Sequence, residues 1–251
     1  MDSGLYAAYT GLLARTQALD TAANNLANAS TTGFRAQRDY FSGVLAGGID
    51  QDPETASQVG QSVNGFGVLG GNRLDLGQGE IKATGNPLDL ALNGPGFFAI
   101  QTSNGIRYTR DGAFSRSSTG VLQTAQGEPV LDTNQKPITI PTGSIYVSPD
   151  ASISVSTADG NVIVGRVGTF DFAEKSVLTA EGANRFSANG AKPISASASL
   201  EQGFVEGANE DAIHGTMQLV LVQRQAEMMQ KALSVFNNDF DKTASEDLPR
   251  V

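Results

Sequence analysis

Near its C-terminus the chain reads, from residue 217 to residue 240, MQLVLVQRQAEMMQKALSVFNNDF. Within this stretch apolar residues follow one another at separations of 3 and 4, which places their side chains on one stripe of an α-helix. The stripe consists of Leu219, Val222, Ala226, Met229, Leu233, Phe236 and Phe240. We predict one helix over residues 210–241, capped by Asn209 and roughly 45 to 50 Å long at about 1.5 Å per residue.

A second apolar set widens this stripe beyond what one partner helix would cover. Its members are Met217, Leu221, Met228, Ala232 and Val235. Burial of one leucine contributes about 1.5 to 3 kcal/mol, so a surface of this kind favours a protein partner over water.

The N-terminal end carries a related pattern, in which leucine recurs every seven residues. The leucines are Leu5, Leu12, Leu19 and Leu26, and Tyr9, Thr16 and Ala23 follow the first three at a distance of four. Alanine is abundant here, and this agrees with helix propensity, so we predict a helix over residues 3–28. The two terminal helices are expected to pair with each other or to pack on the middle of the chain, and the wide C-terminal stripe favours additional partners.

The middle of the chain has the composition of a β domain. Short runs of β-branched and aromatic residues predict strands at 88–92, 97–101, 145–147, 153–155 and 162–172. Asn-Gly and Asp-Gly pairs at 104–105, 111–112, 159–160 and 189–190 are typical of tight turns. No helical pattern separates these strands, so the sheet is predicted to be mostly antiparallel.

The predicted fold class is therefore α+β, with long N- and C-terminal helices that pair as a coiled-coil-like layer and a central β domain. The expected divisions are an N-terminal helix and exit segment at 1–41, a linker at 42–64, the β domain at 65–205, and the C-terminal helix and tail at 206–251.

Composition excludes most routes to catalysis. The 251 residues include no cysteine and one histidine, so thiol chemistry, thiolate zinc sites and histidine-rich metal sites are not available. The formal net charge of −9 argues against nucleic acid and anionic membrane surfaces as partners. No apolar run approaches the ~18 to 20 residues that cross a bilayer, so no membrane insertion is expected. We expect no enzymatic activity, no cofactor and no metal.

Three local patterns point to chemistry, but each has a more ordinary explanation. Residues 65–70 read GFGVLG, the spacing of a dinucleotide-binding loop, yet no strand pattern precedes them and no helix pattern follows. Asp75, Glu80 and Asp89 could supply a glycosidase carboxylate pair, although acidic residues in turns are common. His214 falls in the first turns of the C-terminal helix, where an exposed or interface histidine is the usual case.

Two long stretches resemble the axial proteins of the bacterial flagellum, its rod and hook subunits. The first is TGL at 10–12 together with LDTAANNLANASTTGFR at 19–35. The second runs from GQG at 77–79 through TGNPLDLAL at 84–92 and GPGFF at 94–98 to YTRDGAF at 108–114. A third and weaker match is GFVEGAN at 203–209, where Ala208 and Glu210 depart from the family pattern. Together the matches extend over nearly the whole chain.

The resemblance implies a rod subunit that polymerises through its terminal helices and transmits torque across the periplasm. It assigns the N-terminal leucines and the 219–240 stripe to contacts within and between subunits. It assigns the turn that leaves the N-terminal helix to Asn24, Asn25, Asn28, Thr32, Gly33 and Phe34. The glycine permits a sharp exit, and the phenylalanine is expected to anchor it by burial.

The same resemblance sets expectations for partners and location. The partners would be other rod subunits, copies of the chain itself and the flagellar type III export apparatus. The location would be the periplasmic rod of the basal body, reached without a cleaved signal peptide. The short segment after Phe41 is more typical of the proximal-rod type than of the distal-rod or hook types. A peptidoglycan-binding or peptidoglycan-cleaving β module is the alternative from another class.

Overall fold

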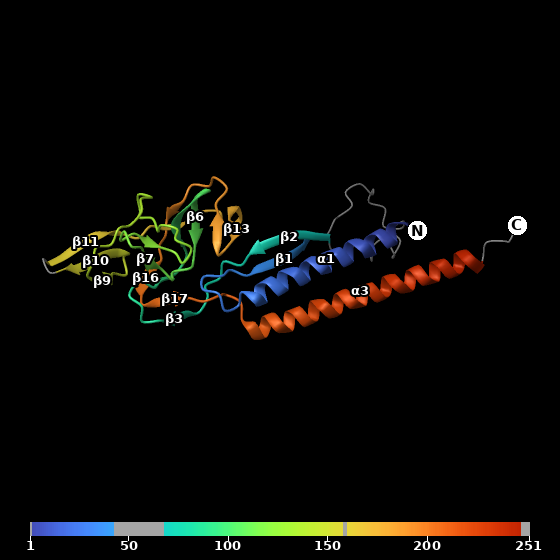
Figure 1. The fold of residues 1–251 in the computed structure, drawn as a ribbon. Helices are drawn as coiled ribbons and strands as arrows, with labels where there is room; N and C mark the ends of the chain where they lie inside the picture. The colour runs from blue at the N-terminus through green and yellow to red at the C-terminus, as the bar shows by residue number, and fades with distance from the viewer. Residues whose placement is uncertain (1, 43–67, 158–159, 247–251) are drawn as a thin grey trace. The chain divides into compact units, whose positions relative to one another are not determined.

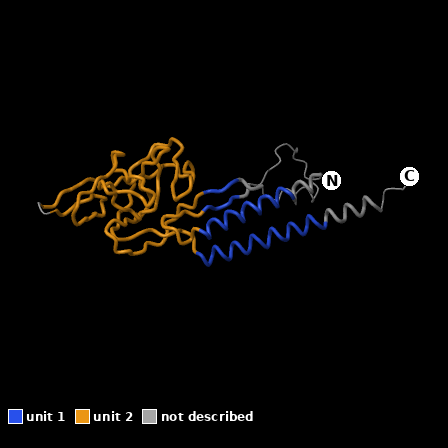
Figure 2. The backbone as a smooth tube through the Cα atoms, viewed as in Figure 1, with its two compact units in different colours: residues 1–27, 37–73, 212–251 blue, residues 28–36, 74–211 orange. Residues whose placement is uncertain are grey.

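A computed structural model of the chain describes residues 2–42, 68–157 and 160–246, with side chains described within 9–40, 71–157 and 160–235. The chain forms two compact units (Figure 2). Residues 1–27, 37–73 and 212–251 form the first, here called the helical unit, and residues 28–36 and 74–211 form the second, here called the β unit.

Among the described residues, the helical unit has two helices and a two-stranded sheet (Figure 1). Its elements are α1 (Asp2–Ala27), β1 (Gln37–Ser42), β2 (Val68–Leu74) and α3 (Ala212–Glu246). The helices at 3–28 and 210–241 are thus confirmed, with α3 beginning two residues later and ending five residues later than predicted. The strands β1 and β2 were not predicted, because residues 37–42 lack a clear apolar alternation. The predicted linker, except for Ser42, lies outside the described residues.

The β unit is built from short strands joined by tight turns. In chain order the strands are β3 (Ile81–Ala83), β4 (Leu90–Asn93), β5 (Phe97–Thr102), β6 (Gly105–Thr109), β7 (Ser115–Arg116), β8 (Leu122–Gln123), β9 (Ser144–Val147), β10 (Ser152–Thr157), β11 (Gly160–Arg166), β12 (Thr169–Asp171), β13 (Thr179–Gly182), β14 (Arg185–Ser187), β15 (Ile194–Ser195), β16 (Ser199–Gln202) and β17 (Phe204–Glu206). A short 3-10 helix, η1 (Lys175–Val177), precedes β13.

The largest sheet has six strands in the order β13-β14-β6-β5-β12-β15, and a second sheet has the order β11-β10-β9. Two further pairs, β16-β4 and β17-β3, join the end of the β unit to its beginning. The strand pairs of the β unit for which register is described are all antiparallel, as predicted. The turn at Asn104-Gly105 joins β5 to β6, and Gly105 has the positive φ of 97° that the tight turn requires.

One predicted strand, at 162–172, is two strands in different sheets. The strand is interrupted at Gly168, where an added Cβ would lie 2.5 Å from the carbonyl oxygen of Asp132. Glycine is therefore required where the backbone passes this close. The pairs at 111–112 and 189–190 also differ from prediction, since neither joins two strands that pair with each other.

The β unit has two apolar cores, one on each side of β5. Phe98 and Ile100 lie in the larger core with residues of β4, β8, β9 and β10. Phe97 and Ala99 lie in the smaller core, where Tyr108 and Phe172 meet edge to face at 4.8 Å between ring centres. The alternation of side chains along a strand explains this division.

Candidate assembly site

The face of α1 that packs against α3 is lined by small residues rather than by leucine. Gly11, Ala14, Ala18 and Ala22 are buried along it, at separations of 3, 4 and 4. An added Cβ at Gly11 would lie 3.3 Å from Cε of Met229, so the two helices approach closely there. Small side chains allow this approach because they occupy little space between the two backbones.

The predicted N-terminal leucines lie beside this face. Leu12, Leu19 and Leu26 are half-buried, while the side chain of Leu5 lies outside the described part of the chain. The structure therefore gives α1 two adjoining faces, one lined by alanine and buried, and one lined by leucine and partly open. The assignment of the leucines to subunit contacts stays a prediction.

The apolar stripe of α3 faces α1 as its spacing indicated. Val222, Ala226 and Leu233 are buried, and Leu219 and Met229 are half-buried. Gly215 continues the buried line toward the start of α3. The side chains of Phe236 and Phe240 lie outside the described residues. The two helices lie side by side in Figure 1.

The second apolar set of α3 remains open to solvent. Met217 is 66% exposed and Met228 is 62% exposed, although both are large and apolar. Ile213, Val220, Leu221 and Val235 are exposed as well. Soluble chains rarely present a contiguous apolar surface of this kind unless a partner covers it.

The polar residues at the end of α1 divide between the two units. In the helical unit, Asn25 pairs with the backbone of Gln37 on both sides, accepting from its N–H at 2.9 Å and donating to its C=O at 2.8 Å. The amide thereby imitates a neighbouring strand and fixes the start of β1 against α1. Asn24 lines a pocket on the same side of α1.

The exit segment itself, residues 28–36, is part of the β unit. Thr32 donates its hydroxyl to Asp111 at 2.9 Å, and its carbonyl accepts from Asn184 at 2.7 Å. Gly33 donates its N–H to the carbonyl of Glu206 at 2.7 Å. Asn28 begins a tight turn by accepting from the N–H of Thr31 at 2.9 Å.

Gly33 has a φ of 68°, and an added Cβ would lie 2.2 Å from the backbone nitrogen of Asp111. The sharp exit expected of this glycine is therefore observed. Phe34 is half-buried, and the fully buried anchor is the next residue, Arg35, which is 2% exposed.

Arg35 belongs to a buried ionic group that sequence reasoning missed. Its Nη2 lies 2.5 Å from Oε1 of Glu206, and Nη1 of Arg110 lies 3.1 Å from Oε2 of the same carboxylate. Arg110 also donates to the carbonyls of Leu92 and Gly94. Burial lowers the pKa of Arg110 to about 10, against the raising effect of Glu206, because charge is costly away from water.

Each member of this group stands in one of the three stretches that carry the family resemblance, Arg35 in the first, Arg110 in the second and Glu206 in the third. That shared position was the available signal. The pairing itself could not be derived, because Arg35 and Glu206 are 171 residues apart in the sequence.

Asn209, predicted to cap α3, has a different role. The prediction is wrong, since α3 begins at Ala212 and the Asn209 amide binds elsewhere in the β unit. Its oxygen accepts from the N–H of Ala36 at 2.8 Å, and its nitrogen donates to the carbonyls of Asp75 and Gly77.

The residues considered for catalysis have structural partners. Asp89 accepts from Thr84 at 2.6 Å and from Asn86 at 2.8 Å, which closes the turn before β4. Asp75 accepts from the N–H of Gly77, and Glu80 pairs with Lys82 at 3.3 Å on the surface. His214 is exposed on the first turn of α3. The first three residues of the 65–70 motif lie outside the described residues.

Within the described ranges, no group of three or more His, Cys, Asp or Glu side chains is placed to hold a metal ion. Among the same residues, no helix is long and apolar enough to span a membrane.

Two family descriptions match the chain. Residues 5–35 match the flagella basal body rod protein family, and residues 91–164 match the D1 domain of the flagellar hook protein FlgE/F/G family. Among similar proteins, the flagellar basal-body rod protein FlgF of Caulobacter vibrioides is 33% identical over 237 residues, which is 93% of each chain. FlgF of Mesorhizobium japonicum is 32% identical over 90% of each chain.

The flagellar basal-body rod protein FlgG of Bacillus subtilis is 31% identical over 88% of this chain and 89% of its own length. Similarity at this level over nearly the full length, together with the two family matches, confirms the resemblance found in the motifs. The chain belongs to the family of flagellar basal-body rod proteins.

Proposed function

We propose that the chain is a structural, non-catalytic subunit of the flagellar basal-body rod and that it assembles through its two terminal helices. The observation that carries this proposal is the open apolar face of α3. The apolar stripe of α3 packs on α1, while Met217, Leu221 and Met228 remain exposed to solvent. Family membership supports the proposal, because the similar proteins are named as rod proteins.

The energy available at this face is considerable. Burial of each large apolar side chain contributes about 1.5 to 3 kcal/mol. The open face carries six such residues, Ile213, Met217, Val220, Leu221, Met228 and Val235. Even after the costs of association, a contact that covers most of them would hold a subunit in a polymer.

Family membership also supports a finer assignment. The chain would be of the proximal-rod, FlgF type, located in the periplasmic part of the basal body. It would be delivered by the flagellar export apparatus and flanked by other rod subunits and by copies of itself. In the polymer, the α1 and α3 helices would continue as a coiled-coil-like inner layer. The absence of cysteine from the sequence is compatible with passage of an unfolded chain through a narrow channel.

The test is complementation of a strain from which the gene has been deleted. The variant Leu221→Asp with Met228→Asp places two charges on the open face of α3 without touching the stripe that packs on α1. We expect the purified variant to keep its helical circular dichroism, and we expect the complemented cells to lack motility and to lack the chain in isolated basal bodies.

The matched control is Gln223→Asp with Gln230→Asp, which adds the same charge at exposed polar positions of α3. We expect this control to assemble. If the Leu221 and Met228 variant restores motility as well as the parental chain does, the open face has no role in assembly and the proposal fails.

A further inference from the structure

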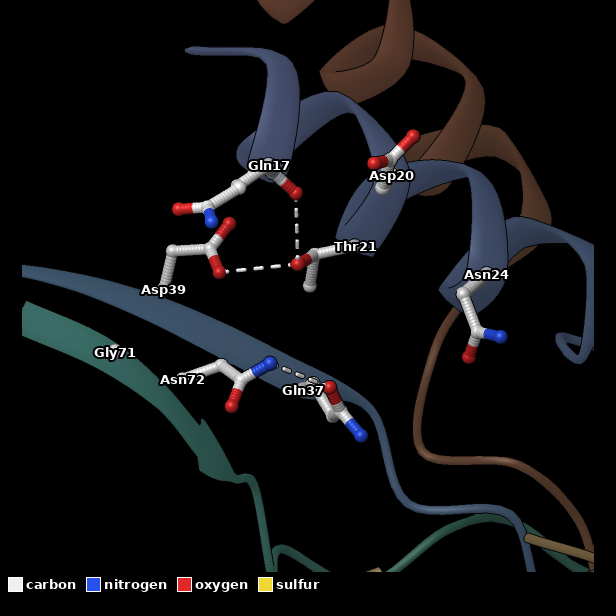
Figure 3. A pocket seen from close by; sticks show the side chains of 8 residues that line it. All are labelled: Gln17, Asp20, Thr21, Asn24, Gln37, Asp39, Gly71 and Asn72. Atoms are coloured by element: carbon white, nitrogen blue, oxygen red, sulfur yellow. Dashed lines mark hydrogen bonds between the residues drawn. The ribbon is translucent and has the colours of Figure 1, made fainter. Parts of the chain in front are cut away.

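The helical unit has a polar pocket on the side of α1 that faces β1 and β2. The pocket has a volume of about 610 Å³. It is lined by Gln17, Asp20, Thr21 and Asn24 from α1, Gln37 and Asp39 from β1, and Gly71 and Asn72 from β2. Figure 3 shows Gln17 and Asp39 at one end of the pocket and Asn24 at the other, with Thr21 between them.

Among the described residues that line the pocket, none carries a positive charge. The charged residues among them are Asp20 and Asp39. The hydroxyl of Thr21 lies 3.0 Å from Oδ1 of Asp39 and 3.1 Å from the carbonyl oxygen of Gln17, so its single proton is divided between two acceptors. Burial raises the pKa of Asp39, and the hydrogen bond from Thr21 only partly offsets this effect.

The open face of α3 carries the complementary charge. Met217, Leu221, Arg224, Met228, Lys231 and Val235 follow one another at separations of 4, 3, 4, 3 and 4. This line is displaced by two residues, or roughly 200°, from the stripe that packs on α1, so it lies on the opposite side of α3. It is a second helix-packing line, with two cations inserted among apolar residues.

Arg224 is placed to bind outside its own subunit. It is exposed, and within the described part of the chain it has no hydrogen bond, ion pair or ring contact. Most other exposed arginines have partners, since Arg38 donates to Gln218 and Arg73 lies over the ring of Tyr40. A guanidinium offers five donors in a planar fork, which suits a site that contains carboxylates.

We propose that the pocket between α1 and the β1–β2 sheet receives Arg224 from a second copy of this chain, with Asp39 as the paired carboxylate. The proposal rests on the function proposed above and specifies one of its contacts. The apolar residues on either side, Leu221 and Met228, would pack around the mouth of the pocket and exclude water. A charge-assisted hydrogen bond is stronger in such a setting than on an open surface.

This contact joins two different surfaces, since the pocket is on α1 and the arginine is on the far side of α3. In Figure 1, α1 lies between β1 and β2 on one side and α3 on the other. A contact between unlike surfaces leaves one of each free at the two ends of any open assembly. It therefore continues from copy to copy as a ring or a helical array and does not stop at a dimer.

Disulfide trapping tests the proposal directly, because the natural sequence has no cysteine. The variant Asp39→Cys with Arg224→Cys is expressed in the deletion strain, oxidised, and analysed on gels without reductant from isolated basal bodies. We expect dimers and higher multimers that collapse to monomer on reduction. The control Asp39→Cys with Ser103→Cys, whose second position is exposed in the β5–β6 turn, is expected to stay monomeric.

Four results would overturn the inference. A monomer-only pattern from basal bodies that contain the paired-cysteine chain shows that the two residues are not adjacent, and it leaves the proposed function intact. Equal cross-linking of the Ser103 control shows that the contact is not specific. Efficient dimers from Arg224→Cys alone show that α3 packs on itself. Absence of the parental chain from basal bodies refutes the proposed function and the inference with it.

Charge reversal gives an independent measurement. We expect Asp39→Arg and Arg224→Asp each to reduce incorporation into basal bodies by about 10- to 100-fold, the range of a hydrogen bond to a charged group. The double variant restores the opposite pair and is expected to recover most of the loss. Failure of the double variant to exceed either single variant contradicts a direct contact.

Discussion

Replacement of Glu206 by glutamine is the most informative change in the β unit. This carboxylate is fully buried and lies against two guanidinium groups, those of Arg35 and Arg110. Its Oε1 also accepts from the N–H of Gly79 at 2.7 Å. Glutamine keeps the size and one oxygen acceptor but removes the charge. The two arginines are then left buried near each other, and Asp171 is the remaining carboxylate that acts on Arg110.

The magnitude follows from counting charges. Loss of one partner from a buried pair costs about 3 to 5 kcal/mol, because the remaining charge is unsatisfied. In Glu206→Gln both cations lose the carboxylate that they contact, so we expect a loss near the upper end of that range. In Arg35→Met the remaining Arg110 and Glu206 form a balanced pair, so we expect a smaller loss of about 1 to 2 kcal/mol. The test is whether Glu206→Gln lowers the free energy of unfolding by more than Arg35→Met does.

The assay is urea unfolding followed by tyrosine fluorescence, which is available because the chain has five tyrosines and no tryptophan. The control is Lys82→Met, which breaks the pair between Lys82 and Glu80 at the surface. Pairs of that kind contribute about 0 to 1 kcal/mol. If Glu206→Gln costs no more than Arg35→Met, or if both match the control, the buried charges do not act as described.

Three further predictions concern other parts of the chain. Gly33→Ala should destabilise the β unit by more than about 2 kcal/mol, whereas Gly127→Ala, which shares a positive φ but has nothing within 4 Å, should cost only about 1 kcal/mol in the same urea assay. Burial raises the pKa of Asp111, so the folded state binds more protons than the unfolded state just above the ordinary pKa, and stability should fall as pH rises through that window. Asp111→Asn should flatten this dependence in unfolding measured from pH 3 to 7. Ala18→Leu should weaken the packing of α1 on α3 by about 1 to 3 kcal/mol, while Leu13→Ala at an exposed position should change stability little.

The helices could be predicted because their apolar residues repeat at a helical period over many turns. In α3 the period also identified the face that packs on α1, since Val222, Ala226 and Leu233 are buried. In α1 the same reasoning favoured the leucines, and the structure buries Ala14 and Ala18 more deeply. Both lines are apolar at helical spacing, and the choice between them depends on how closely the partner helix approaches. That distance is a tertiary property.

The strands were predictable where β-branched and aromatic residues form a continuous run, as in β5 and β10. The break inside 162–172 was not, because Gly168 looks like an ordinary strand glycine until the backbone of Asp132 is placed beside it. The pocket was also beyond sequence reasoning. Asp39 and Thr21 are 18 residues apart on different elements, and neither belongs to a recognisable motif.

The two ends of the β unit meet at Glu206, so the exit segment can reach its folded position only after residue 206 is present. In the exit segment, the N–H of Gly33 donates to the carbonyl of Glu206, and the guanidinium of Arg35 pairs with the Glu206 carboxylate. Residue 206 is made 171 positions after Arg35. In a chain that folds as it is made, residues 28–36 therefore reach their place only once β17 is present. The exit segment becomes fixed only when almost all of the chain is available, so an incomplete chain does not have a finished β unit.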